Sequence, residues 1–212
     1  MFLLRLAWKN LLRTKRRTAL SSGAVVLGVF YLIVGRSFIG GLDEGIIAAS
    51  INGFTAHVTV RAAGYPQQGL NHPIDDRVPV NDAMRGWLDQ QKAWTTRQLF
   101  IATVISGSDS LRVRGVAFDP DRDPQVFARA LWEVQGAIPR EHDDGVLVAS
   151  GLAKLLAVGV GDHLVVKART AAGALNALDL PVAGLVQPGN LAMNTNTIFF
   201  PQSLATDLLR TE

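Results

Sequence analysis

The feature that most constrains this chain is an uncharged stretch of eighteen residues near its N-terminus. From Thr18 to Gly35 no side chain carries a charge, and most are apolar. A helix needs about 20 such residues to cross the roughly 30 Å hydrocarbon core of a bilayer. Arg36 follows, but a long cationic side chain near a helix end reaches the headgroups. The stretch therefore predicts a transmembrane helix over residues 18–40.

The basic residues around this span predict its orientation. Six cations and no acid precede the span, namely Arg5, Lys9, Arg13, Lys15, Arg16 and Arg17. Beyond it, up to residue 65, only Arg36 and Arg61 are basic. Because positively charged flanks stay in the cytoplasm, we predict a cytoplasmic N-terminus and an external location from Asp43 onward. A cleavable signal peptide is the alternative, but its apolar core would be shorter, and Ser37–Gly40 is a poor cleavage site.

Two further features predict how the N-terminal segment meets its surroundings. In the cytoplasmic segment 1–17, apolar and basic residues mix around Trp8, which suits an amphipathic helix lying in the membrane interface. Within the span, Ala24, Gly28 and Gly35 fall near one helical face. Small residues let a second helix approach closely, although they are also common in membrane helices without this role. We predict that these three positions pack against a membrane partner.

The charge balance argues against a nucleic-acid partner. The whole chain carries 21 − 18 = +3, and without the six N-terminal cations residues 18–212 sum to 3 − 6 = −3. A nucleic-acid footprint needs basic residues clustered on a folded face, often with stacking aromatic residues. The chain also has no cysteine, so it forms no disulfide and no thiolate metal site.

The pattern from residue 41 to 212 predicts a mixed α/β domain, so that the chain as a whole is α+β. We expect strands over 57–62, 99–107, 110–118, 145–149, 178–186 and 196–200, a turn and a strand within 159–169, and helices over 81–92, 123–134, 150–158 and 203–210. We expect Asn81 or Asp82, Ser150 and Ser203 to cap three of these helices. The pattern also allows two subdomains, with one inserted near 65–140.

Motifs for cofactors and metals are incomplete. Gly23 and Gly28 have the spacing of a phosphate loop, but Val29 and Phe30 stand where Lys and Ser or Thr are required. We therefore predict a non-catalytic chain with no cofactor of its own.

Acidic residues and histidines likewise give no complete metal motif. Asp119, Asp121 and Asp123 resemble the start of a calcium loop, yet Pro124 and Ala130 replace its Gly and Glu, so a solvated turn is the simpler interpretation. The four histidines are widely separated, namely His57, His72, His142 and His163. We predict no metal site.

Three stretches, in this order, carry a family resemblance. They are LAWKNLLRTKRRTALSSGAVVLGVF (6–30), RGVAFDPDRD (114–123) with GVLVASGLAKLLAVGVGDHLVV (145–166), and VAGLV (182–186) with NTIFFPQSLATDLL (196–209). Together they resemble permease subunits of ABC transporters of the MacB, LolC/LolE and FtsX type. The first stretch resembles the opening of that family's first membrane helix, and the others resemble its MacB-like periplasmic core domain.

The resemblance implies a mechanical role in the bacterial inner membrane. In this family a partner ATPase binds ATP and Mg²⁺ in the cytoplasm, and two permease subunits, identical or related, convert its cycle into motion outside. Three more membrane helices follow the periplasmic domain in the family, and this sequence stops at Glu212 before any of them. We therefore expect it to be the N-terminal part of such a subunit.

The resemblance also bears on the cargo. AHVTVRAAGY (56–65) resembles the LolC/LolE branch more than the exporters, which favours release of lipoproteins or other amphipathic cargo from membrane lipid. MacB-like export of peptides or drugs is the alternative within the family. A single-pass anchored periplasmic adaptor or sensor domain is the alternative outside it.

Overall fold

The computed structural model describes residues 15–62, 74, 78, 80–127, 133–188 and 191–211. The chain divides into two units, Met1–Ile47 and Ala48–Glu212. The predictions for Trp8 and Arg13, and for His72, lie outside the described residues.

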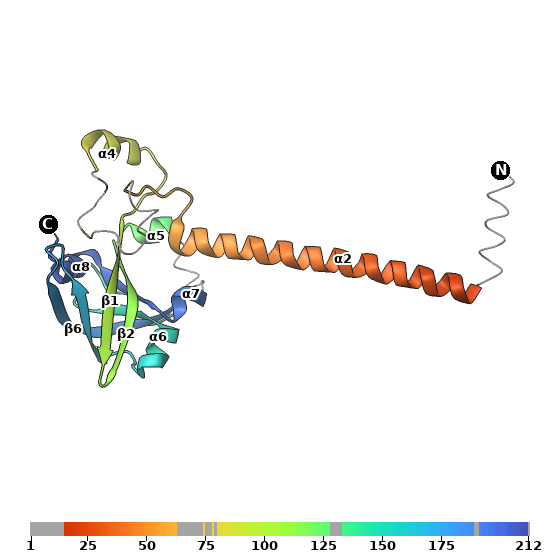
Figure 1. Cartoon of the computed structure of the whole chain (residues 1–212). Helices are drawn as coiled ribbons and strands as arrows, with labels where there is room; N and C mark the ends of the chain where they lie inside the picture. The colour runs from red at the N-terminus through yellow and green to blue at the C-terminus, as the bar shows by residue number, and fades with distance from the viewer. Residues whose placement is uncertain are drawn as a thin grey trace. The chain divides into compact units, whose positions relative to one another are not determined.

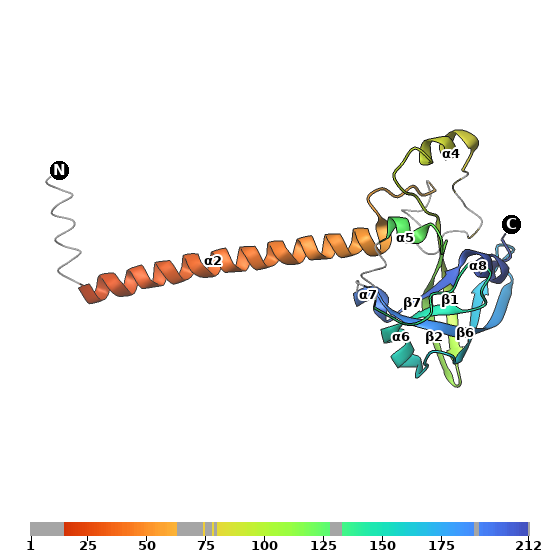
Figure 2. The same ribbon diagram turned by 180° about the vertical axis from the view of Figure 1, so that it is seen from behind.

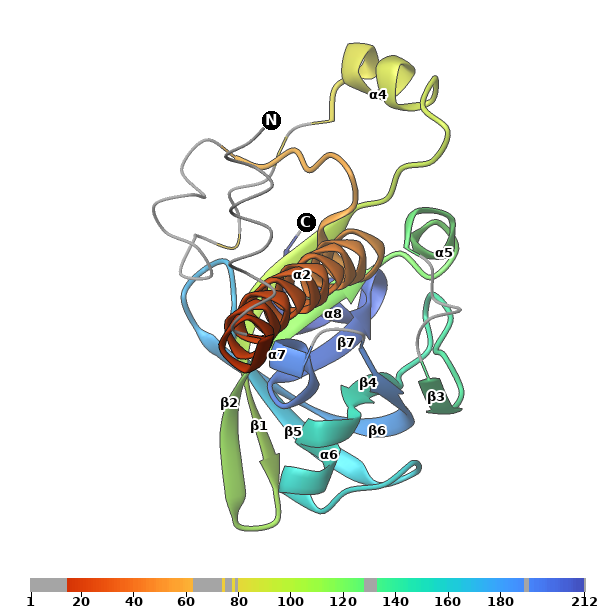
Figure 3. The same cartoon turned by 90° about the vertical axis from the view of Figure 1, so that its right-hand side faces the viewer.

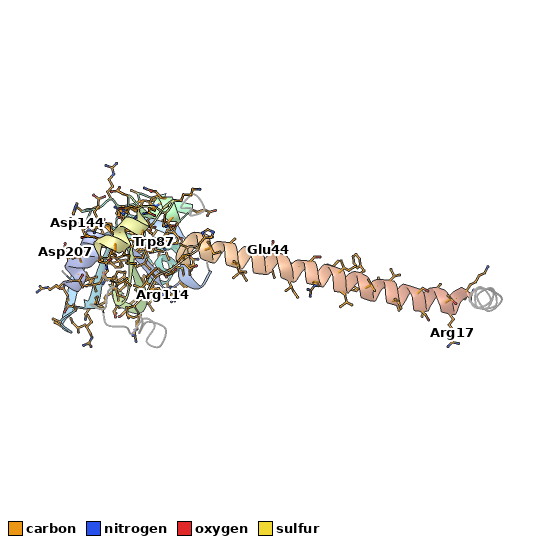
Figure 4. All side chains as sticks on the ribbon, turned by 90° about the horizontal axis from the view of Figure 1, so that it is seen from above. Arg17, Glu44, Trp87, Arg114, Asp144 and Asp207 are labelled. Carbon is orange, nitrogen blue, oxygen red and sulfur yellow. The ribbon has the colours of Figure 1, made fainter. Side chains whose placement is uncertain are left out.

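The described part of the first unit is a long helix. Helix α2 spans Lys15–Ser50 and contains the whole uncharged stretch (Figure 1). Its part Lys15–Ala48 is long and apolar enough to cross a membrane, and the most apolar 18-residue window has a mean hydropathy of 1.9 with no residue buried. Its side chains stand clear along the helix (Figure 4), and Leu20 and Leu32 are 80% and 74% exposed. Because exposed apolar surface is unfavourable in water, we expect lipid or other helices to surround this helix.

The helix runs further than predicted. It ends at Ser50, not at residue 40, and the π-helix η1 (Ile51–Thr55) follows it. Gly40, Gly41 and the acids after them end the apolar stretch but do not break the helix, because the following residues lack proline and include good helix formers. The backbone then leaves the helix at Ala56, which has a φ of 53°. The predicted membrane boundary at residue 40 stays a prediction.

The second unit is built on a mixed sheet. Its described strands are β1 (Arg97–Ser106), β2 (Asp109–Phe118), β3 (Glu133–Gly136), β4 (Val146–Ala149), β5 (His163–Arg169), β6 (Leu175–Gln187) and β7 (Thr197–Pro201). They form one seven-stranded sheet in the order β3-β6-β4-β7-β2-β1-β5. Strand β5 pairs with β1 and also with β6, so the run of hydrogen-bonded neighbours closes on itself. The chain is thus α+β, with one apolar helix followed by a sheet domain.

The sheet contains both parallel and antiparallel strand pairs. The pairs β2–β7 and β4–β6 are parallel, and the other strand pairs are antiparallel. Strands β1 and β2 form a hairpin whose turn extends away from the other strands (Figure 3). Residues 65–140 supply β1, β2 and β3, and these strands share the sheet with strands from later in the chain.

Short helices complete the unit. They are α4 (Asp82–Leu88), α5 (Asp123–Val126), α6 (Ser150–Leu156), α7 (Leu191–Asn194) and α8 (Gln202–Leu209). Helices α6 and α8 lie at different ends of the curved sheet (Figure 2). Helix α6 buries Leu152 and Leu156 in one main core, and α8 buries Leu204, Leu208 and Leu209 in the same core.

The central strands are buried on both faces. In β4, Val146 and Val148 join the main core, whereas Leu147 joins a second, smaller cluster. In β7, Phe200 joins the main core and Phe199 the smaller cluster. Near-continuous apolar runs are typical of strands covered on both faces, which explains why these segments showed no alternation in the sequence.

Two predicted elements are wrong in type or length. Residues 57–62 alternate in sequence but form no strand, and Val58 is 76% exposed, because no described strand pairs with them. The helix predicted over 123–134 ends at Val126, and residues 133–136 form β3. The buried Phe127 is extended, with φ −108° and ψ 124°, so the backbone cannot continue the helix there.

Capping follows the prediction at one helix and departs from it at two. Asn81 caps α4, since its side chain accepts a hydrogen bond from the Met84 N–H at 2.8 Å. At α6 the N–H of Gly151 donates instead to Asn194 Oδ1 at 3.1 Å. At α8 the N–H of Ser203 donates to Glu141 Oε1 at 2.6 Å. The last two caps come from distant residues, so local sequence did not reveal them.

Candidate functional site

A buried ion pair lies where the chain enters the sheet. Arg97 opens β1 and Asp123 opens α5. Arg97 Nε donates to Asp123 Oδ1 at 2.8 Å, and Nη2 donates to Oδ2 at 2.7 Å. The two side chains are only 9% and 1% exposed. A bidentate arginine–carboxylate pair fixes orientation as well as distance.

The same guanidinium also holds the segment that follows α2. Arg97 Nη1 donates to the carbonyl of Gly53 in η1 at 3.1 Å. Its plane lies over the ring of Phe127, 3.5 Å from the centroid. We call Gly53, Arg97, Asp123 and Phe127 the Arg97 junction. This junction joins η1, β1 and α5 through one side chain that cannot lose its charge at ordinary pH.

The turn before α5 positions Asp123. Asp119 Oδ1 accepts hydrogen bonds from the N–H groups of Asp121 and Arg122, both at 3.0 Å. The Asp119 carbonyl accepts from the N–H of Asp123, also at 3.0 Å. The solvated turn that we expected is therefore correct for Asp119 but wrong for Asp123. That carboxylate is buried against a cation, an arrangement that a short acidic motif does not reveal.

A second set of contacts lies beside this turn. The Arg122 guanidinium lies 4.0 Å from the ring centroid of Trp94, and Trp94 Nε1 donates to Asp89 Oδ1 at 3.1 Å. Arg122 also approaches Asp119 at 3.8 Å. A shallow pocket of about 300 Å³ opens here. It is small and polar, and we assign no ligand to it.

A larger open groove lies on another side of the sheet. It has a volume of about 720 Å³ and runs between α6 and the strands β3 and β6. Its lining includes Ala153, Val158 and Leu185, with Lys154 and Glu133 among the polar residues. The groove has room for an extended segment.

The predicted helix-packing positions lie on open surface. No atom comes within 4 Å of a Cβ built on Gly28 or Gly35, and Ala24 is exposed. The three positions therefore leave room for a neighbouring helix, and their packing role stays a prediction. The basic residues Lys15, Arg16 and Arg17 are exposed at the start of α2, where Figure 4 labels Arg17.

The described histidines lie apart from one another. His163 Nδ1 is 3.2 Å from Asp179 Oδ1 on the surface, His142 donates its backbone N–H to Ser203 Oγ at 3.1 Å, and His57 is exposed. Within the described ranges, no three His, Asp or Glu side chains gather into a group that could hold a metal ion.

Sequence reasoning missed the Arg97 junction. Arg97 and Asp123 are 26 positions apart, and neither belongs to a motif that demands the other. The available signal was weak: an arginine two positions before a predicted strand and an aspartate directly before a proline. Only the pairing of β1 with β2, which runs directly into the Asp119 turn, brings the two side chains together.

Comparison with known proteins gives a partial likeness in structure. No protein-family model and no curated protein matches the chain. The extracellular domain of the noncanonic ABC-type transporter YknZ from Gram-positive bacteria is similar in structure, with 13% identity and a TM-score of 0.44. The likeness covers 58% of this chain and 62% of that chain, so less than two thirds of the solved domain is matched.

Proposed function

We propose that this chain is the N-terminal part of an ABC transporter permease subunit. In this proposal α2 spans the bacterial inner membrane, the N-terminus is cytoplasmic, and the sheet domain works in the periplasm. The observation that carries the proposal is a long helix whose apolar span has no buried residue, followed by a segment held in the Arg97 junction.

The sequence motifs support this proposal because they fall on the elements that it needs. The first stretch, 6–30, includes the start of the apolar part of α2. The second, 114–123, runs from β2 through the Asp119 turn to Asp123, and so ends inside the Arg97 junction. The stretches 145–166 and 196–209 contain β4, α6, β7 and α8, which build the main core.

Helix length supports a mechanical role. At about 1.5 Å per residue, the 36 residues of α2 extend for about 54 Å, well beyond the roughly 30 Å of a hydrocarbon core. Such a helix can carry a displacement from one side of a bilayer to the other while ATP stays on a partner chain. Three hydrogen bonds from one guanidinium then oppose any slipping of η1 and α5 relative to β1.

The proposed cargo is a lipoprotein, which the domain would help to release from the inner membrane. Support comes from the resemblance of residues 56–65 to the LolC/LolE branch. In the described part of that stretch, Val58 and Val60 are both exposed. Export of peptides or drugs is the alternative.

Co-purification from native membranes tests the proposal. The full-length protein, extracted with mild detergent, should bring down an ATPase subunit and a second permease subunit, and the complex should release an added lipoprotein in an ATP-dependent manner. A complex with ATPase activity but no lipoprotein release would reject the cargo and keep the transporter. Recovery of the protein without any ATPase would instead favour an anchored adaptor or sensor.

A further inference from the structure

On strands β2, β1, β5 and β6, the side of the sheet opposite the main core carries an arrangement of side chains to which the proposed function assigns no role. Along β1, Phe100, Ala102 and Val104 point into the main core. Side chains of a strand alternate, so Ile101, Thr103 and Ile105 point to the opposite side. The same alternation turns the even-numbered residues of β5 inward and its odd-numbered residues outward.

Strand register gathers cations on this outward side. Thr103 is paired with Arg112 of β2 on one side and with Lys167 of β5 on the other. One step along β5, Arg169 is paired with Leu175 of β6. We call Thr103, Arg112, Lys167, Arg169 and Leu175 the basic face. Neighbouring strands are about 4.8 Å apart, so Arg112 and Lys167 start about 10 Å from each other.

This concentration of charge runs against the composition of the domain. Residues 18–212 sum to −3, yet Arg112, Lys167 and Arg169 are all exposed on one side of the sheet. The acid nearest to them in the register is Asp179 of β6, which contacts His163 at 3.2 Å. Arg114, labelled in Figure 4, continues the same row of outward residues on β2.

Apolar side chains are interleaved with these cations. Leu175 is 71% exposed and lies opposite Arg169, and Val165, which is 37% exposed, lies opposite Ile105 of β1. None of the residues of the basic face lines either of the two grooves described above. Apart from His163, the exposed outward residues of these strands include no aromatic side chain on which nucleic-acid bases could stack. Cations mixed with aliphatic side chains on a face without a groove suit a lipid headgroup layer.

We propose that the basic face docks onto a bilayer surface that contains anionic phospholipids. This inference rests on the proposed insertion of α2, because a helix in the bilayer keeps the domain at a high effective concentration beside lipid. Each cation close to an anionic surface favours binding by roughly fivefold, and three therefore favour the docked state by roughly a hundredfold. This attraction falls as salt is raised, because exposed charges are screened.

The lack of cysteine allows a direct test with the full-length chain. Ala177, exposed and paired with Lys167, is replaced by cysteine and labelled with a fluorophore. Gln135→Cys on β3, which is paired with Leu185 eight residues further along β6, serves as the control position. Both proteins are reconstituted into vesicles whose lipids carry a quencher, either of neutral phosphatidylcholine or with about a third of phosphatidylglycerol. Flotation of the vesicles reports insertion of α2 independently of docking.

We expect strong quenching at position 177 in anionic vesicles, weak quenching in neutral vesicles or at about 0.5 M salt, and little change at position 135. The triple variant Arg112→Glu, Lys167→Glu and Arg169→Glu should abolish quenching at position 177. The matched variant Arg85→Glu, Lys92→Glu and Lys154→Glu changes the net charge by the same amount, but it should retain the quenching at position 177.

Different failures identify different errors. A protein that does not float with any vesicle overturns the proposed function. A protein that floats but shows equal quenching in neutral and anionic vesicles, or equal quenching in both triple variants, overturns only the docking proposal. Quenching that is absent in every vesicle, together with protection of the label by added polyglutamate, overturns lipid as the partner and points to an acidic protein.

Discussion

At the scale of single residues, the Arg97 side chain holds η1 and α5 to β1, although its place in the sequence gives no sign of this role. The guanidinium is nearly buried, and its three hydrogen bonds reach two other elements. Removing one member of a buried pair leaves the other charge unpaired in a poor solvent for ions. Replacing both members with apolar residues removes that penalty.

We therefore expect Asp123→Ala to lower the free energy of unfolding by about 3–5 kcal/mol. The double variant Arg97→Met and Asp123→Leu should recover a large part of this loss. Urea titration of the detergent-solubilised protein, followed by tryptophan fluorescence, measures both. A loss below about 1 kcal/mol for Asp123→Ala would mean that water reaches the pair and that the junction does not hold η1.

A glycine in the main sheet gives a second test at this scale. Gly115 of β2 is paired with Phe100 of β1, and a Cβ on Gly115 would lie within 2.8 Å of three atoms of the Phe100 ring. We expect Gly115→Ala to destabilise the domain by about 1–3 kcal/mol because the buried ring must move.

Gly86 provides the matched control for that substitution. It lies in α4 with open space around the position of a Cβ. Gly86→Ala should stabilise the protein by about 0.5–1 kcal/mol, because alanine has the higher helix propensity. Equal effects of the two alanines, measured by the same urea titration, would show that Phe100 does not pack on Gly115 as described.

At the scale of elements, the sequence was informative wherever a local pattern determines the structure. The uncharged stretch predicted α2, and the periodicity of residues 99–118 predicted β1 and β2. The sequence was uninformative where a residue or strand far away in the chain determines the local structure. The strand β3 exists because it pairs with β6, and α6 is capped by Asn194. The basic face is of the second kind, because only the register of the strands brings its cations together.

The small residues of α2 lead to a prediction about assembly. Gly28 lies in open space on an exposed apolar helix, so a larger side chain there affects only a neighbouring helix. We expect Gly28→Leu to reduce co-purification of partner membrane subunits severalfold, because close approach of the two backbones is lost.

Val26→Leu serves as the control for Gly28→Leu. It adds bulk to the same helix about 200° around the axis and should leave assembly intact. Immunoblotting of partner subunits after affinity capture measures both variants. If Gly28→Leu assembles as well as Val26→Leu, the predicted packing face is wrong.

At the scale of the whole molecule, orientation depends on where the cations lie along the chain. The cations before the uncharged stretch include Lys15, Arg16 and Arg17, whereas Arg36 is the first to follow it. In a membrane this difference favours a cytoplasmic N-terminus. The transporter proposal requires that orientation, since the ATPase and the sheet domain must lie on opposite sides.

Neutralising the N-terminal cations should therefore weaken the orientation without preventing insertion. In a variant with Arg13, Lys15, Arg16 and Arg17 all changed to glutamine, we expect a clear fraction of the molecules to leave the sheet domain in the cytoplasm. Gln135→Cys reports the side, because a membrane-impermeant maleimide added to spheroplasts labels only external cysteines. Arg36→Gln removes a cation from the other flank and should keep labelling complete. If the quadruple variant were labelled as fully as the parent, the cations would not determine the orientation, and the external position of the domain would need another cause.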